Sequence, residues 1–250
     1  TEVIATIFVV DDDSDMAEYL RDILSDEFTV EKFTSPTALL DRIRTESPDI
    51  VISDVMMPEM RGDELCRIIK TDMATSHIPV ILLTGLNSRR DIVAGLEARA
   101  DDYVVKPFDI VVLKARIRNI LTRRAELSRR MIDDNVAPEE VEELSNELDR
   151  KFMTRMREAV DAHLSDADFS VADLCNKLAM SRTSVYNKIK SLTGQSLNEF
   201  IRIMRLNRSR ELLATGNYNV SEVAYMVGFS DPKYFSTCFK KQFGMSPSKL

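Results

Sequence analysis

The chain has 250 residues and a formal net charge of −7, with 44% apolar and 30% charged residues, a composition ordinary for a soluble globular protein. No run approaches the roughly 18 to 20 apolar residues that would cross a bilayer. Three scattered cysteines, and two histidines without metal-ligand spacing to them, argue against a disulfide framework or a zinc site. We therefore expect a cytoplasmic protein of two domains whose segment here makes no membrane contact.

Short β-branched apolar runs alternate with amphipathic helical stretches in the first half of the chain. The runs lie at 4–10, 28–33, 49–53, 78–84 and 102–105, and each is followed by a helix candidate. The third and fourth are nearly all apolar, as expected for central strands buried on both faces. This pattern predicts an α/β domain over 1–124, a doubly wound sheet of five parallel strands whose ligands bind at the carboxyl ends of the strands.

Polar residues stand at the carboxyl ends of the predicted strands. They are Asp11 and Asp12 after the first, Asp54 at the end of the third, Thr84 at the end of the fourth and Lys106 after the fifth. Because these ends converge on one crevice, we expect the carboxylates, hydroxyl and amine to lie together. Clustered carboxylates favour a divalent cation, and Mg²⁺ suits carboxylates, a carbonyl and waters. The set is typical of a phosphoryl acceptor.

Residues 4–122 resemble the response-regulator receiver family through the motifs VVDDDSDM, ISDVMMPEMRG, PVILLTG and ADDYVVKPF. The resemblance implies a flavodoxin-like receiver that binds Mg²⁺, with a histidine kinase, separate or in the same polypeptide, as phosphodonor. It implies these roles: Asp54 as phosphoacceptor; Asp11, Asp12, Asp54 and the Met56 carbonyl as metal ligands; Thr84 and Lys106 as phosphate-binding residues; Tyr103 as an aromatic switch that turns inward on phosphorylation; and a cis Lys106–Pro107 bond.

Two other functions of the acidic residues are disfavoured, because in each case one position holds a residue of the wrong type. A calcium loop starting at Asp11 would need glycine where Met16 stands. A Mg²⁺-dependent phosphatase with Asp54 as nucleophile would need a second aspartate where Met56 stands. We therefore predict a regulator rather than an enzyme.

Composition changes sharply in the segment 125–148, which has 2 basic against 8 acidic residues and contains Pro138. This predicts an acidic linker, part of which continues the preceding helix. Residues 1–148 hold 18 Lys and Arg against 31 Asp and Glu, a charge of −13, whereas residues 149–250 hold 16 against 10, a charge of +6. A basic domain therefore follows an acidic one.

Only helical patterns occur in 149–250, and one of them is repeated. SVADLCNKLAMS at 170–181 matches NVSEVAYMVGFS at 219–230, an offset of 49 residues, which indicates a duplicated helical unit. In each unit a turn leads to a second helix with a buried stripe. The exposed faces of these second helices carry residue types that contact bases or phosphates: Arg182, Thr183, Tyr186, Asn187 and Lys190 in the first, and Lys233, Tyr234, Thr237 and Lys240 in the second.

A long helix from about 197 to 213 is predicted between the two units, and it carries four arginines. The domain resembles the arabinose-regulator (AraC) family through GQSLNEFIRIMRLNRSRELL and VSEVAYMVGFSDPKYFSTCFKKQFGMSPSKL. The resemblance implies an all-α domain with two helix-turn-helix units that binds double-stranded DNA in successive major-groove segments. Arg208, Arg210 and Lys241 taken singly are better explained as solvated helix charges.

Together the two resemblances imply a two-component response regulator whose phosphorylation controls sequence-specific DNA binding and transcription, similar to the carboxyl end of a hybrid sensor. We expect phosphorylation to raise DNA affinity by forming a homodimer. The competing mechanism is that phosphorylation releases the basic domain from inhibition by the acidic one. A helical half that binds protein instead of DNA is the remaining alternative.

Overall fold

The computed structural model describes residues 5–85, 98–133, 144, 146–166 and 169–250. The chain forms two compact units, Thr1–Leu127 and Ser128–Leu250. Within the described ranges, no helix has the length and apolar character needed to cross a membrane. The three cysteines are free and buried.

The first unit contains the predicted parallel sheet, with strands in the order β2-β1-β3-β4-β5. The strands are β1 (Thr6–Val10), β2 (Thr29–Phe33), β3 (Ile50–Asp54), β4 (Val80–Thr84) and β5 (Asp102–Val105). The described helices are α1 (Ser14–Leu24), α2 (Pro36–Ile43), α3 (Gly62–Thr71) and α5 (Ile110–Asp133). The helix predicted after β4 falls outside the described residues. The doubly wound fold predicted from the alternating pattern is thus confirmed.

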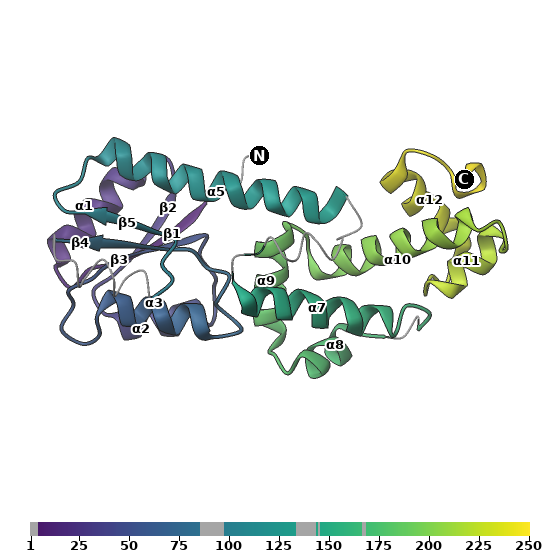
Figure 1. Cartoon of the computed structure of the whole chain (residues 1–250), viewed down its shortest axis with the longest axis horizontal. Helices are drawn as coiled ribbons and strands as arrows, with labels where there is room; N and C mark the ends of the chain where they lie inside the picture. Colours follow the sequence, from purple (N-terminus) through teal and green to yellow (C-terminus); the bar gives the residue numbers. More distant parts are fainter. Residues whose placement is uncertain (1–4, 86–97, 134–143, 145, 167–168) are drawn as a thin grey trace. The chain divides into compact units, whose positions relative to one another are not determined.

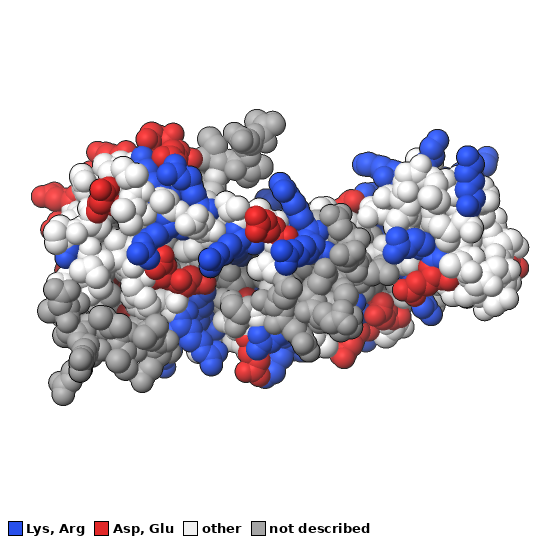
Figure 2. All heavy atoms as spheres, turned by 45° about the horizontal axis from the view of Figure 1, so that its top comes forward, with Lys and Arg blue, Asp and Glu red and all other residues white. Residues whose placement is uncertain are grey.

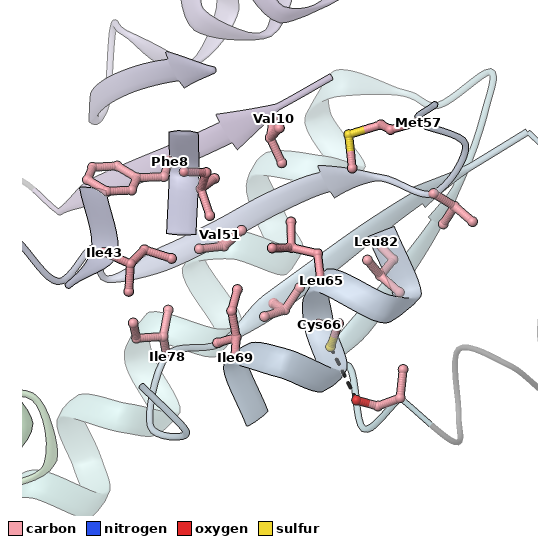
Figure 3. Packing of buried hydrophobic residues seen from close by; sticks show 14 residues of the cluster. Phe8, Val10, Ile43, Val51, Met57, Leu65, Cys66, Ile69, Ile78 and Leu82 are labelled. Atoms are coloured by element: carbon pink, nitrogen blue, oxygen red, sulfur yellow. Dashed lines mark hydrogen bonds between the residues drawn. The ribbon is translucent and has the colours of Figure 1, made fainter. Parts of the chain in front are cut away.

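Helices cover both faces of this sheet, α1 and α5 on one and α2 and α3 on the other (Figure 1). Alternate residues of β1 serve the two faces: Phe8 and Val10 join the core under α2 and α3, and Ile7 and Val9 join the core under α1 and α5. Figure 3 shows the first of these cores, where strand side chains meet those of α3. Each such side chain contributes roughly 1.5 to 3 kcal/mol on burial.

The second unit is helical, and its helices repeat as predicted. It contains α7 (Glu147–Asp161), α8 (Val171–Leu178), α9 (Arg182–Thr193), α10 (Leu197–Ala214), α11 (Val220–Met226), α12 (Pro232–Phe243) and the 3₁₀ turn η1 (Pro247–Lys249). The pairs α8–α9 and α11–α12 form the two helix-turn-helix units. The segment assigned to the linker by composition is helical at both ends, because α5 extends to Asp133 and α7 begins at Glu147.

Matching caps explain why both units fold alike. Capping boxes begin α8 at Ser170 and α11 at Asn219, and each supplies hydrogen bonds to otherwise unpaired amides. Left-handed glycines end α9 at Gly194 and α12 at Gly244, a conformation that glycine adopts without steric cost. The two second helices therefore begin and end at positions 50 residues apart.

Candidate functional site

A lysine bridges two buried carboxylates at the carboxyl ends of the strands. Lys106 Nζ lies 2.6 Å from Asp54 Oδ1 and 3.0 Å from Asp11 Oδ2. Asp11 is 2% exposed and Asp54 is 7% exposed. The second oxygen of each carboxylate accepts a backbone N–H, from Met56 at 2.8 Å for Asp54 and from Asp13 at 3.0 Å for Asp11. The structure thus brings together the predicted acceptor, its neighbouring acid and the predicted phosphate-binding lysine.

Strand pairing places the lysine in this position. Thr84 pairs with Val105 in the β4–β5 register, and the Lys106 N–H donates to the Thr84 carbonyl at 2.7 Å. The Thr84 side chain, 6% exposed, therefore lies at the same edge of the sheet. The Lys106–Pro107 bond is cis, as the receiver resemblance implied.

Burial and charge act in opposite directions on these groups. Burial raises the pKa of the Asp11 carboxyl, and this outweighs the hydrogen bond from Lys106 that lowers it. Burial alone would lower the pKa of the Lys106 ammonium, but hydrogen bonds to Asp54 and Asp11 raise it overall. Lys106 consequently remains protonated and neutralises only part of the carboxylate charge.

The remaining acidic residue, Asp12, is exposed beside the pocket. Three carboxylates and one ammonium leave two negative charges, which suits a divalent cation. Among the described residues no three acidic, histidine or cysteine side chains are grouped tightly enough to enclose a metal. Asp11, Asp12 and Asp54 offer the hard carboxylate oxygens that Mg²⁺ takes, and water and a carbonyl would complete its shell. The residues fit the expected ion on these grounds.

Gly62, the first residue of α3, belongs to the construction of this pocket although we did not select it from the sequence. Its N–H donates to the Val55 carbonyl at 3.0 Å. A Cβ at Gly62 would overlap the backbone carbonyl oxygen of Asp54 and lie 2.9 Å from the Ser53 hydroxyl oxygen. Glycine is therefore needed for α3 to approach the strand end that carries Asp54.

Replacing Gly62 with alanine is expected to displace β3 from α3 and to lower the free energy of unfolding by about 1 to 3 kcal/mol, the usual cost of overpacking. Urea unfolding measures this cost. The matched control is Gly85→Ala, because a Cβ at Gly85 meets nothing within 4 Å and the change should stay within about 0.5 kcal/mol. Equal stability of the two variants would contradict the close-approach argument.

Tyr103 already lies inward in this structure. It packs against the core under α2 and α3, and its hydroxyl oxygen is buried. Burial raises the pKa of the hydroxyl to about 12. The inward turn that we expected on phosphorylation is therefore the position seen here, so a switch role for Tyr103 would involve release of this ring as well as its capture.

The predicted DNA-contacting residues lie on open faces of α9 and α12. Their buried stripes are as predicted, with Val185 and Ile189 in α9 and Phe235 and Phe239 in α12 fully buried. On α9 the opposite face exposes Arg182, Thr183, Tyr186 and Lys190, and Asn187 is half-buried there. On α12 the opposite face exposes Lys233, Tyr234, Thr237 and Lys240. The geometry thus leaves both sets available to a ligand.

Unpaired positive charge gathers on these two helices. From α7 to η1, some Lys and Arg side chains have no ion pair, hydrogen bond or ring contact among the described residues: Lys177, Arg182, Lys190, Lys233, Lys240, Lys241 and Lys249. All but Lys177 and Lys249 lie on α9 or α12. Figure 2 shows Lys and Arg projecting from the C-terminal end of the helical unit. Acidic side chains of the described residues therefore do not neutralise the two exposed faces.

The arginines of α10 have structural partners instead. Arg202 pairs with Glu199, Arg208 pairs with Glu211, and Arg210 lies 5.0 Å from the Phe243 ring centre.

Arg205 of α10 links the turn of the second helix-turn-helix unit to the segment that follows α7. It donates to the Asp166 carbonyl at 2.9 Å and to the Gly228 carbonyl at 3.1 Å, and burial lowers the pKa of its guanidinium. Gly228, in the turn of the second unit, has φ of +78° and would overlap the Leu164 carbonyl if it carried a Cβ. This contact fixes the second unit against the end of α7.

Comparison with known proteins agrees with both halves. A family model described as a response regulator receiver domain matches residues 7–118, and one described as a helix-turn-helix domain matches residues 174–250. "Histidine kinase P4" of Formosa agariphila is 37% identical over 246 residues, covering 98% of this chain and 18% of that protein. "DNA-binding response regulator MtrA" of Mycobacterium tuberculosis is 39% identical over 127 residues, covering 50% of this chain and 54% of MtrA.

Among solved structures, a signal receiver domain of a signal transduction histidine kinase from Syntrophus aciditrophicus has 39% identity and a TM-score of 0.46, covering 47% of this chain and 90% of that one. The chain thus spans less than a fifth of the kinase and about half of the regulator that it matches.

A parallel sheet with a carboxylate and lysine pocket, followed by paired helix-turn-helix units, defines the response-regulator class. The chain belongs to the receiver family over residues 7–118, and an AraC-type helix-turn-helix domain follows it at 174–250. Both resemblances stated from the motifs are confirmed.

Proposed function

We propose that this chain is a two-component response regulator in which phosphorylation of Asp54 controls binding to double-stranded DNA and thereby transcription. The observation that carries the proposal is the pairing, in one chain, of a buried carboxylate contacted by Lys106 with two helices whose exposed cations have no acidic partner within the described ranges. Such a regulator acts where the DNA is, so we assign it to the cytoplasm.

The pocket supports acceptance of a phosphoryl group from a phosphohistidine of a kinase. An Asp54 oxygen forms the new O–P bond while the N–P bond of the donor breaks and the imidazole takes a proton. Lys106 binds a phosphoryl oxygen with its ammonium group, and the Thr84 hydroxyl donates to another. Asp11, Asp12, Asp54 and the Met56 carbonyl would hold a Mg²⁺ ion, which would neutralise charge on the phosphoryl group. The chain itself contributes position and charge rather than a catalysed turnover.

The helical unit supports binding in two major-groove segments. Recognition helices of this type enter the groove and contact base edges with their first turns. One long helix, α10, lies between the two units. Its Arg205 donates hydrogen bonds both to the turn of the second unit and to the segment that follows α7. We propose that α9 and α12 occupy segments about one helical turn, or roughly 10 bp, apart on one face of the DNA.

An apolar face on the receiver supports pairing with a second copy. Val105 at the end of β5 is 47% exposed, and Val111 and Val112 at the start of α5 are 66% and 46% exposed. Phosphorylation at the neighbouring pocket would shift the conformation of this face through movements of Thr84 and Tyr103, and so change its tendency to pair. Two paired receivers would place two DNA-binding units on neighbouring half-sites at raised effective concentration.

A gel shift with a selected DNA fragment tests the proposal. A small phosphodonor with Mg²⁺ should raise the affinity of the wild type by about 5- to 150-fold, the usual range of such coupling, and should leave Asp54→Ala unchanged. Footprinting should show two protected grooves, and sedimentation should show a dimer only after phosphorylation.

Each alternative gives a different result in these experiments. No retention of any DNA at low salt would indicate that the helical half binds protein. A persistent monomer that still gains affinity would favour release of the basic unit from the acidic receiver over dimerisation. A single protected groove would mean that one helix-turn-helix unit is structural.

A further inference from the structure

Arg205 of α10 holds two backbone carbonyls that belong to segments far apart in the chain. Its two Nη atoms donate to the Gly228 carbonyl at 3.1 Å and to the Asp166 carbonyl at 2.9 Å. Gly228 lies in the turn between α11 and α12, and Asp166 lies between α7 and α8. Because a guanidinium is planar and presents its donors in a fixed fork, this one side chain sets the distance between the two carbonyls.

The two segments also approach each other closely through their backbones. A Cβ at Gly228 would overlap the Leu164 carbonyl oxygen and would lie 2.9 Å from the Arg205 guanidinium carbon. The turn of the second helix-turn-helix unit is therefore seated against the segment between α7 and α8, and the guanidinium closes the contact.

On one side this contact leads to the recognition helix α12. Phe229 follows Gly228 in the turn, and its ring packs edge-on against the Phe235 ring of α12, with centres 5.2 Å apart. Phe235 is fully buried in the core of the second helix-turn-helix unit. Because this core is close-packed, a shift of the turn would carry α12 with it.

On the other side the contact leads to the recognition helix α9. The segment that holds Asp166 follows α7, and Asp149 of α7 pairs at 2.7 Å with Lys188 of α9, which is fully buried. Arg155 of α7 also donates to the Lys177 carbonyl of α8 at 3.0 Å. The recognition helices are thus connected by this path as well as by α10, which runs between the two helix-turn-helix units (Figure 1).

The separation of α9 and α12 decides which DNA sites both helices can enter together. One additional base pair between two groove segments moves the second segment by about 3.4 Å along the DNA axis. It also turns that segment by about 35° around the axis, because 10 to 10.5 base pairs complete one turn. A rigidly held pair of recognition helices loses the base contacts of one helix on such a site, whereas a loosely held pair can follow the change.

We propose that Arg205 is a positioning residue that sets the spacing between the two DNA segments that this chain recognises. The inference rests on the DNA binding proposed above and adds a source of specificity that requires no contact with DNA. By fixing the turn of the second helix-turn-helix unit to the segment between α7 and α8, Arg205 makes the chain select operators by the distance between their two segments.

The test compares the affinities of the full chain for three duplexes by fluorescence anisotropy. They are a selected operator, the same operator with one base pair inserted between its two footprinted segments, and a half operator that keeps one segment. The wild type should bind the lengthened operator at least about ten-fold more weakly than the original, because base contacts of one helix are lost. Arg205→Met should bind both almost equally, chiefly through lost affinity for the original. Arg205→Lys should also lose discrimination, because an ammonium group on a flexible stem does not fix the two carbonyls.

Two controls separate a loosened second unit from an unfolded one. Arg208→Met removes the same charge from an exposed position of α10, where Arg208 pairs with Glu211 of the same helix, and it should discriminate between the operators as the wild type does. The Arg205 variants should unfold cooperatively on heating and should still bind the original operator more tightly than the half operator.

Unchanged discrimination in either Arg205 variant, or an equal loss of discrimination in Arg208→Met, would overturn the positioning role. Equal binding of the original and lengthened operators by the wild type would also overturn it. If both Arg205 variants bound the original operator no more tightly than the half operator, Arg205 would be a structural residue only, and the inference would be wrong. Failure of the wild type to bind any of the duplexes would overturn the proposed function as well.

Discussion

Phosphoryl transfer to this chain is expected to be abolished by Asp54→Ala, because Asp54 is the buried carboxylate at the end of β3 that Lys106 contacts at 2.6 Å. The protein is treated with a small phosphodonor and Mg²⁺, and the acid-labile phosphate is located by mass spectrometry. The wild type should carry one labelled peptide, containing Asp54, and the alanine variant should carry none.

Substitutions at the other acidic positions separate the acceptor from its neighbours. Asp11→Ala and Asp12→Ala should lower the rate of labelling but leave the label on Asp54, because we propose these residues as ligands of the metal ion and not as the phosphoryl acceptor. Asp15→Ala, an exposed carboxylate in the first turn of α1, should label at the wild-type rate. Label retained by Asp54→Ala would show that another residue is the acceptor.

Phe239→Ala is expected to unfold the helical unit under conditions in which the wild type is stable. The Phe239 ring is fully buried and lies 5.7 Å from the Phe235 ring and 4.6 Å from the Phe243 ring. Truncation leaves a cavity in this aromatic cluster, at a cost of about 3 to 5 kcal/mol. Thermal unfolding followed by circular dichroism measures the loss.

Tyr234→Ala is the matched control on the same helix. Tyr234 is 53% exposed on the opposite face of α12, so its truncation should lower the stability by about 0.5 kcal/mol or less but weaken DNA binding. If both variants lost stability equally, the division of α12 into a buried stripe and a DNA-contacting face would be wrong.

Much of the fold and of the pocket formed by Asp11, Asp54 and Lys106 could be predicted from the sequence, because both depend on local patterns and a general topological rule. The apolar runs identified the strands, and the residues after them identified the pocket, since parallel strands end at one edge. The contact between Lys106 and Asp11, 95 residues apart, follows from this rule without any knowledge of side-chain packing. The duplicated helices were predictable for a similar reason, because capping residues recur with the repeat.

Long-range packing decided the rest, because burial depends on what another segment brings to a side chain. Lys188 and Lys190 look alike in the sequence, yet Lys188 is 0% exposed and pairs with Asp149 at 2.7 Å, whereas Lys190 is exposed. Arg205 likewise resembles its neighbours on α10 but holds the turn of the second unit.

The sequence by itself determined the fold class, the grouping of carboxylates and lysine at the strand ends, and the repeat, because strand and helix periodicity, polar residues at strand ends and helix caps act over a few residues. The tertiary structure alone decided that Gly62 must lack a Cβ against Asp54, that the Tyr103 ring lies inward, and that Arg205 bridges the carbonyls of Asp166 and Gly228. These three outcomes depend on how separate elements pack against one another, and the period of a single helix or strand does not encode that packing.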